Sequence, residues 1–187
     1  HLASSAASDV YKRQSHIRQT ENVVLIAATE AGYSNLVDLV SKSYLDTEEG
    51  ARAQLRFDWL KDRAEGVICL TGGPLGPIGR MIADGHQPIA EQRLLALKDI
   101  YGDRLYIELQ RHKGYDRAVE QGSVDLAYRH LVPLVATNEA FFLKPDDFEA
   151  HDALIAIAEG SLLSIDERRH LTPDHWLKPE AEMIALF

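Results

Sequence analysis

The stretch GVICLTGGPLGPIG, residues 66–79, decides the fold class of this chain. Its first five residues form a short run that is apolar on both faces, which is typical of a parallel strand covered by helices. The glycines and prolines of residues 71–79 then predict a loop. The next segment, residues 88–101, has Ala90, Leu94, Leu97 and Tyr101 at helical spacing and a proline suited to a first turn. The order of strand, loop and helix predicts one unit of an α/β fold.

The same alternation continues on both sides of this unit. An apolar strand at residues 23–27 precedes a helix on which one face is expected to carry Tyr33, Leu36, Val37, Val40 and Tyr44. Further strands are expected at residues 104–109 and 133–138, and further helices at 116–130 and from 145 to 160. Strands that alternate with helices predict a parallel sheet or a parallel barrel.

Composition limits the possible functions. The 187 residues suffice for one domain, and 45% of them are hydrophobic. A net charge of −9 argues against nucleic-acid binding by this chain alone, because binding to phosphates depends mainly on clustered Lys and Arg. The single cysteine, Cys69, excludes an internal disulfide and a multi-cysteine zinc site. With no long apolar run and no charged-then-apolar leader, we expect a cytoplasmic protein without a membrane partner.

The two ends of the chain carry unusual signals. Residues 5–14, SAASDVYKRQ, have no apolar period, and residues 9–14 back-translate to GAT GTG TAT AAG AGA CAG, the recognition end used by a transposase. A polar terminus is the simpler interpretation, but we favour a translated sequencing adapter over residues 1–14, which are then excluded from the fold. Because the last residues, 178–187, stop within a helical pattern, we expect the parent chain to continue past 187.

Candidate site residues lie just past the predicted strands, where parallel α/β folds collect their chemistry. His112 follows the third strand and could act as a metal ligand or general base, and Glu139 follows the fourth. Two donors do not make a metal site, since three or four must converge. The loop at residues 71–79 lacks the lysine of a phosphate-binding loop, so a rigid connection is the better interpretation. The remaining histidines are expected at the surface or between helices.

Two longer stretches identify a family. IYGDRLYIELQRHKG at residues 100–114 and LVPLVATNEAFFLKPDDFEAHDALIAIAEG at 131–160 resemble, in order, the polymerase and histidinol phosphatase (PHP) domain that begins bacterial DNA polymerase III α subunits. The resemblance extends from about residue 21 to the end. It implies a distorted parallel (β/α) barrel, incomplete at its N-terminus, and it makes residues 15–187 a partial PHP domain.

The resemblance also implies where a metal centre would lie. His112 matches a histidine that metal-binding members retain after this strand, whereas Gly73 stands at the position of a cysteine ligand. Glu139 stands at the position of an aspartate, and Phe141 at that of the last histidine. Glycine and phenylalanine cannot donate to a metal, so we predict that this domain holds none and has no catalytic residue of its own. Cys69 lies four residues before Gly73, within the strand, and does not replace the lost ligand.

For the parent chain, the resemblance implies DNA-directed DNA synthesis in bacterial replication. The Mg²⁺ ions of that reaction would be held by carboxylates outside this sequence. The implied partners are a proofreading exonuclease subunit, a sliding clamp and a clamp loader, with DNA bound by other domains. This domain would then be a structural support and docking platform. The alternatives are a metal-dependent phosphoesterase or 3′–5′ exonuclease of the same family, or an error-prone paralogue of the α subunit.

Overall fold

The computed structural model describes residues 20–47, 53–165 and 169–187. The predicted adapter at residues 1–14 lies outside these residues and stays a prediction. The described part of the chain is a mixed α/β fold around a four-stranded sheet with the strand order β1-β2-β3-β4. The strands are β1 (Val24–Ala27), β2 (Val67–Leu70), β3 (Leu105–Gln110) and β4 (Leu134–Thr137). All four agree with the strands predicted from the sequence, with boundaries that match to within two residues.

The direction of β1 differs from the expectation of an all-parallel sheet. β2, β3 and β4 run parallel to one another, whereas β1 pairs antiparallel with β2, from Val24 opposite Leu70 to Ala27 opposite Val67. The prediction of parallel strands is therefore wrong for β1. The pattern of apolar residues in this four-residue strand indicates which of its faces is buried, but it carries no information on whether the strand runs parallel or antiparallel to its neighbour. Closure into a barrel is not seen in the described sheet, and it stays a proposal.

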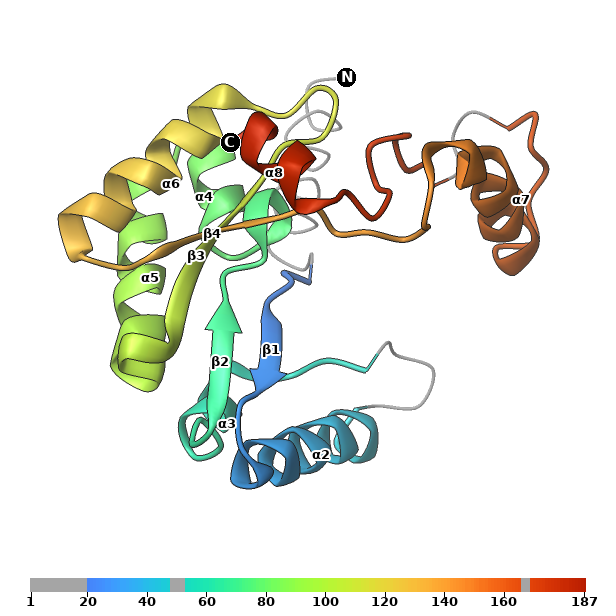
Figure 1. Ribbon diagram of the computed structural model, residues 1–187. Helices are drawn as coiled ribbons and strands as arrows, with labels where there is room; N and C mark the ends of the chain where they lie inside the picture. The colour runs from blue at the N-terminus through green and yellow to red at the C-terminus, as the bar shows by residue number, and fades with distance from the viewer. Residues whose placement is uncertain (1–19, 48–52, 166–168) are drawn as a thin grey trace, which may run out of the picture.

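Three helices cover one face of the sheet and enclose the core (Figure 1). These helices are α4 (Gly79–Ala83), α5 (Gln87–Tyr101) and α6 (Arg117–His130). Every residue of the inner stripe predicted for α5 is buried, and so are Val119, Leu126 and Ala127 of α6. From the sheet, Val67, Cys69, Leu105 and Ile107 face the same core. Hydrophobic periodicity alone therefore predicts α5 and α6 correctly, whereas the short helix α4 is not among the predicted elements.

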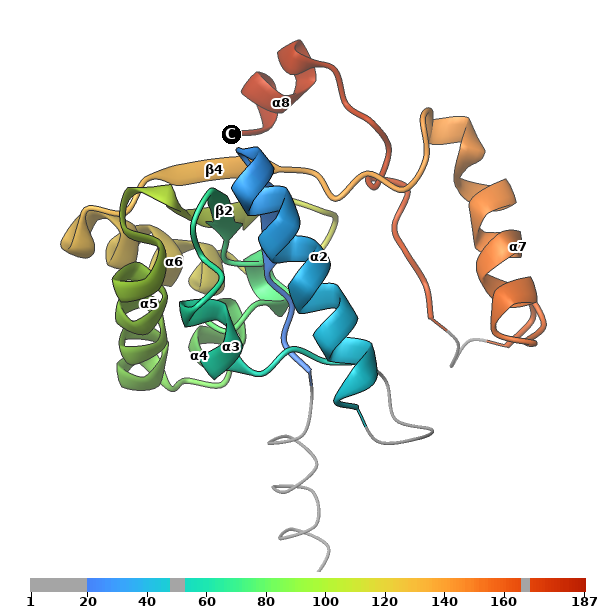
Figure 2. The same ribbon diagram turned by 90° about the horizontal axis from the view of Figure 1, so that it is seen from below.

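Helix α2 (Glu30–Leu45) packs differently from the sequence prediction. It buries Gly32, Leu39 and Ser43. Of the predicted stripe, Leu36 is partly buried against the core, whereas Tyr33, Val37, Val40 and Tyr44 are exposed. A Cβ atom at Gly32 would lie 1.9 Å from the carbonyl oxygen of Gly66, so only glycine allows the helix to approach the start of β2 this closely. Figure 2 shows α2 crossing beside β1 and β2. The close backbone contact selects the buried face of α2.

The remaining elements lie around the ends of the sheet. They are the short helix α3 (Phe57–Lys61), the 3₁₀ turns η1 (Gly73–Leu75), η2 (Gly102–Arg104) and η3 (Pro145–Asp147), and the helices α7 (Phe148–Ala158) and α8 (Glu180–Leu186). Both Figure 1 and Figure 2 place α7 apart from the sheet. Within the described residues, no helix has both the length and the apolar character needed to cross a membrane.

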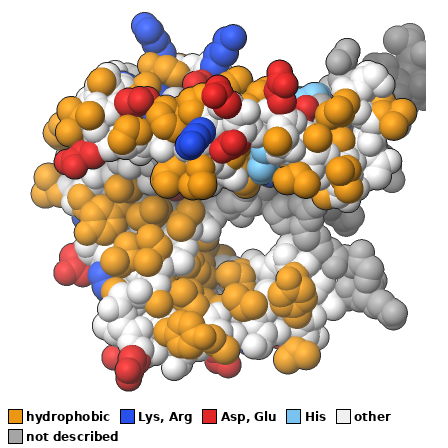
Figure 3. Space-filling view, turned by 45° about the vertical axis from the view of Figure 1, so that its right-hand side comes forward, with side chains coloured by type: hydrophobic (Ala, Val, Ile, Leu, Met, Phe, Trp, Pro, Cys, Tyr) orange, Lys and Arg blue, Asp and Glu red, His pale blue; other side chains and the backbone are white. Residues whose placement is uncertain are grey.

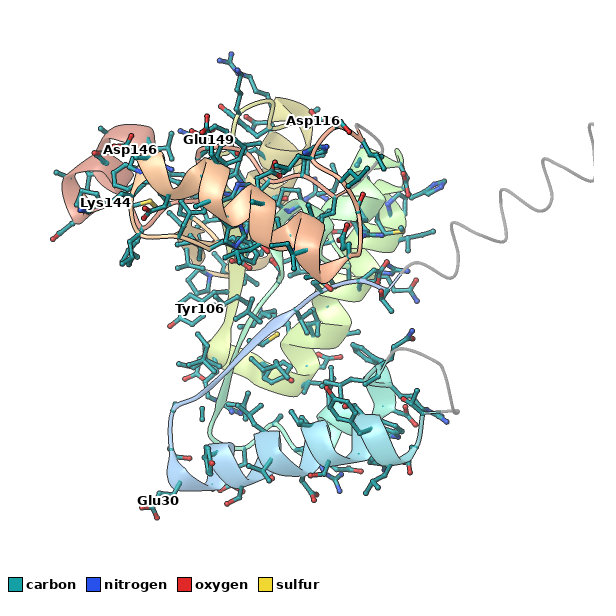
Figure 4. All side chains as sticks on the ribbon, turned by 90° about the vertical axis from the view of Figure 1, so that its right-hand side faces the viewer. Glu30, Tyr106, Asp116, Lys144, Asp146 and Glu149 are labelled. Carbon is teal, nitrogen blue, oxygen red and sulfur yellow. The ribbon has the colours of Figure 1, made fainter. Side chains whose placement is uncertain are left out.

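The face of the sheet opposite the core is largely open. Val24 and Ile26 of β1 are 40% and 45% exposed, and Ile68 and Tyr106 are half-buried beside them. Tyr106, labelled in Figure 4, lies on the side of β3 away from α5. In Figure 3, hydrophobic side chains cover much of the middle and lower part of the view, next to a hollow. Apolar surface of this extent is typical of regions that contact other protein.

The two faces of α2 give a direct test of the packing. We expect Leu39→Ala to lower the free energy of unfolding by about 2–5 kcal/mol, because Leu39 is 1% exposed and its removal leaves a cavity. Val40→Ala, next to it but 54% exposed, is expected to cost less than about 1 kcal/mol. Urea unfolding of both variants provides the measurement. An equal loss for Val40→Ala would show that the exposed stripe is packed in solution.

Candidate functional site

The candidate site lies where the three parallel strands end. Each of β2, β3 and β4 is followed by a polar or glycine-rich segment, at residues 71–76, 111–113 and 138–141. Because neighbouring parallel strands point the same way, these segments meet at one edge of the sheet. In the structure, Gly73, His112, Glu139 and Phe141 each lie two to four residues past the end of one of these strands. The contacts of each residue decide what the site can do.

Gly73 opens the turn η1 and has no room for a side chain. Its φ is +56°, and a Cβ atom built there would lie 2.8 Å from Oε1 and 2.9 Å from Cδ of Gln110. The space next to Gly73, Glu108 and Gln110 is a cavity of about 20 Å³, enough for roughly one water molecule. Gln110 therefore occupies the place into which a ligand side chain at position 73 would project.

His112 is held by protein contacts on its edge and its face. Its Nε2 lies 2.9 Å from the carbonyl oxygen of Asn138, and its ring stacks on His175 with the centroids 3.8 Å apart. A carbonyl oxygen only accepts hydrogen bonds, so Nε2 carries the proton and has no free lone pair for a metal. Only Nδ1 of His112 is left as a potential donor.

Phe141 and Glu139 complete the predicted set without forming a cluster. The ring of Phe141 lies 5.9 Å from that of His175 and 5.8 Å from that of His151, so the position is occupied by an aromatic contact. Glu139 is exposed and has a φ of +42°, a left-handed conformation that costs a non-glycine residue about 1–2 kcal/mol. The structure brings His112 and Phe141 to the same stacked group through His175, whereas the Glu139 side chain faces solvent.

A segment near the end of the chain, residues 172–178, is fastened over this edge. Asn138 is its anchor: Nδ2 donates to the carbonyl oxygens of Asp174 at 2.8 Å and Trp176 at 2.6 Å, and Oδ1 accepts from Lys178 at 3.1 Å. The backbone N–H of Phe141 donates to the carbonyl of His175 at 2.8 Å. Asn138 and His175 are both buried, although the sequence singles out neither.

The residues present do not fit a metal centre. Of the four family positions, two have no donor atom, one has a protonated Nε2 and one points to solvent. The described residues contain no group of three or more His, Cys, Asp or Glu placed to hold an ion. Cys69 is fully buried in β2, and burial raises the pKa of its thiol to about 12, so the thiolate that a metal would need is strongly disfavoured.

The placement of His175 differs from the sequence prediction. The sequence predicts it at the surface or between helices, but it is 7% exposed within the 172–178 segment and stacks on His112. Sixty-three positions separate the two residues in the sequence, so no spacing rule could pair them. His130 does lie between helices, with Nε2 2.6 Å from Glu91 of α5. The family-like stretches at residues 100–114 and 131–160 contain the strand ends that His175 contacts, but they give no signal for His175 itself.

Two glycines with positive φ test the space around Gly73. Gly73→Ala is destabilised both by its backbone conformation and by displacing Gln110, whereas Gly85→Ala, at φ +75° with no atom within 4 Å of the new Cβ, is destabilised by the backbone alone. We expect Gly73→Ala to lower the free energy of unfolding by about 1–3 kcal/mol more than Gly85→Ala. Thermal or urea unfolding would measure the difference. Equal losses would mean that Gln110 moves aside at no cost.

The stacked histidine predicts a pH dependence of stability. Burial lowers the pKa of His175 below its usual value, and the neighbouring His112 lowers it further. The unfolded chain binds this proton more readily, so the contribution is present above about pH 6.5 and is lost as the pH falls toward the lowered folded pKa. We expect His175→Phe to flatten this decline and His86→Phe, at an exposed site, to leave it unchanged. If the stability of His175→Phe falls with decreasing pH as steeply as that of the unaltered chain, His175 is not the source of the pH dependence.

Comparisons with known proteins identify the family of the chain. The PHP domain model matches residues 6–112, which include Gly73 and end at His112. The chain is 44% identical over 167 residues to a DNA polymerase III subunit alpha of Caulobacter vibrioides, 36% over 165 residues to that of Pseudomonas aeruginosa, and 33% over 168 residues to that of Escherichia coli K12. These matches cover 87–89% of the chain but only 14% of each relative. Because the family model covers more than half of its length, the chain belongs to the PHP domain family.

Proposed function

We propose that this chain is part of a bacterial DNA polymerase III α subunit and that its PHP domain is a metal-free structural support and docking platform. The observation that carries the proposal is the combination of two facts. Relatives named DNA polymerase III subunit alpha match 87–89% of the chain. Of the four positions that the resemblance links to metal ligands, Gly73, His112 and Phe141 are engaged in contacts within the protein.

The proposal assigns DNA synthesis to the parent protein and not to these residues. The parent would be a DNA-directed DNA polymerase acting in bacterial DNA replication in the cytoplasm, with Mg²⁺ held by carboxylates outside this sequence. The net charge of −9 is compatible with DNA binding by other parts of the parent. We favour the replicative form over an error-prone paralogue.

Docking is supported by the apolar surface that the fold leaves open. The exposed stripe of α2 consists of Tyr33, Val37, Val40 and Tyr44. A second exposed group, Leu154 and Ile157, lies on α7, away from the sheet. The partners proposed for these surfaces are the proofreading exonuclease subunit and, through the parent chain, the sliding clamp and clamp loader. Tyrosines such as those of the α2 stripe are enriched among the few residues that carry most of the binding energy at protein interfaces.

Binding to the exonuclease subunit of the same bacterium tests the platform. We expect the chain to bind it with a dissociation constant in the micromolar range or tighter, measured by calorimetry. Serine substitutions in the α2 stripe or in the α7 group are expected to weaken binding about tenfold or more for the surface that is used, while the other serves as the matched control. No binding at about 100 µM would remove the docking role.

A metal-dependent phosphoesterase is the alternative that must be tested beside it. The expected result is no zinc or manganese retained after purification and no phosphodiester hydrolysis by the chain. Stoichiometric metal, together with hydrolysis that His112→Ala abolishes, would favour the phosphoesterase over the platform.

A further inference from the structure

The strand ends meet at a buried carboxylate that none of the comparisons assigns. Glu108, near the end of β3, is 5% exposed. Its Oε2 accepts a hydrogen bond from the backbone N–H of Gly72 at 3.0 Å, and its Oε1 accepts from Gln110 at 3.2 Å and from the hydroxyl of Thr137. These three donors come from the segment after β2, from β3 and from β4. One side chain therefore joins three strands.

The charge balance at Glu108 is unusual. Within the described residues, no lysine, arginine or histidine forms an ion pair with it. Taking a carboxylate out of water is costly unless hydrogen bonds replace the lost solvation. Three neutral donors do so here, and hydrogen bonds to an ionised acceptor are about twice as strong as neutral ones. The carboxylate is thus held by the protein itself, with both oxygens engaged.

The hydrogen bonds around Glu108 are mutually consistent. Thr137 has one hydroxyl hydrogen, which goes to Glu108, and its oxygen accepts from Nε2 of Gln110 at 3.3 Å. Nε2 of Gln110 has two hydrogens, which it donates to Oε1 of Glu108 and to the hydroxyl oxygen of Thr137. Thr71, only 2% exposed, accepts from the backbone N–H of Glu108 at 3.0 Å. Both oxygens of Glu108, the hydroxyl of Thr137 and Nε2 of Gln110 have partners, and a buried polar network stabilises a fold only when its groups are paired in this way.

We infer that Glu108, Gln110 and Thr137 form a hydrogen-bonded lock that closes the ends of β2, β3 and β4 on one another without a metal ion. Gln110 links the lock to the altered family position, because it fills the space that a side chain at Gly73 would need. The lock consists only of residues of this chain. It goes beyond the proposed function, since it holds whether or not the chain docks another protein.

A buried glutamate can serve as a catalytic group, as a metal ligand or as a lock, and each role predicts a different response of stability. A residue kept for chemistry is often destabilising, so its replacement leaves stability equal or higher. A metal ligand makes stability depend on metal, because an ion that binds the folded state alone raises the unfolding midpoint. A lock predicts a large loss on replacement and no response to metal.

The experiment is urea unfolding of the 187-residue chain and three variants, each with EDTA, zinc or manganese. Glu108→Gln keeps the shape of the side chain but removes its charge. Its amide nitrogen is a donor and would face the groups that now donate hydrogen bonds to Glu108. We expect it to lower the equilibrium constant for folding about tenfold to a hundredfold. Thr137→Val, which removes one donor, is expected to lower it about threefold to tenfold. Glu65→Gln, at an exposed position, is expected to change it less than about twofold.

Coupling between the variants makes the test specific. In the double variant Glu108→Gln/Thr137→Val, the loss should be smaller than the product of the two single losses, because both remove the same hydrogen bond. If Glu108→Gln does not fold, Thr137→Val and Gln110→Ala carry the same comparison. An unchanged or raised stability of Glu108→Gln or Thr137→Val, or independent effects of the two, would overturn the lock. The lock would also be overturned if zinc or manganese raised the urea midpoint of unfolding and Glu108→Gln abolished that rise.

Discussion

The parallel alignment of β2, β3 and β4 is the constraint on which the rest of the structure depends. It brings three strand ends to one edge of the sheet, where Asn138 is buried under the 172–178 segment. Buried polar groups must find partners within the protein. Glu108 and Asn138 supply acceptors and donors in several directions at once, and the segments around them are positioned by these bonds.

Local sequence patterns predict the elements that are stabilised locally. The stripe of α5 and the apolar run of β2 face a single core, so periodicity identifies both. On α2, the apolar stripe is largely exposed, and the buried face is the one that brings Gly32 against Gly66, thirty-four positions away. The antiparallel direction of β1 is likewise set by pairing and not by its own residues. Long-range contacts therefore decide what periodicity leaves open.

The candidate site is predictable in position but not in its contacts. The predicted strand ends and the resemblance to the family locate Gly73, His112, Glu139 and Phe141. That Gly73 and Phe141 have no side-chain atom able to bind a metal follows from residue type alone. The stacking of His175 on His112 and the placement of Gln110 against Gly73 depend on side chains that meet only in the folded chain. Asn138 has the sequence context of a strand end, yet in the fold it anchors a distant segment.

These contacts show how the strand ends are kept together by groups of the protein itself. A shared ion draws several side chains to one point, and so does a buried carboxylate that accepts from several strands. Removing a ligand leaves space and unpaired polar groups unless the neighbours change with it. Here a glutamine fills the space beside a glycine, and aromatic rings pack where a histidine would stand. The strand ends are thereby held by contacts within the protein, whereas the apolar side chains that the fold leaves exposed lie on α2, β1 and α7.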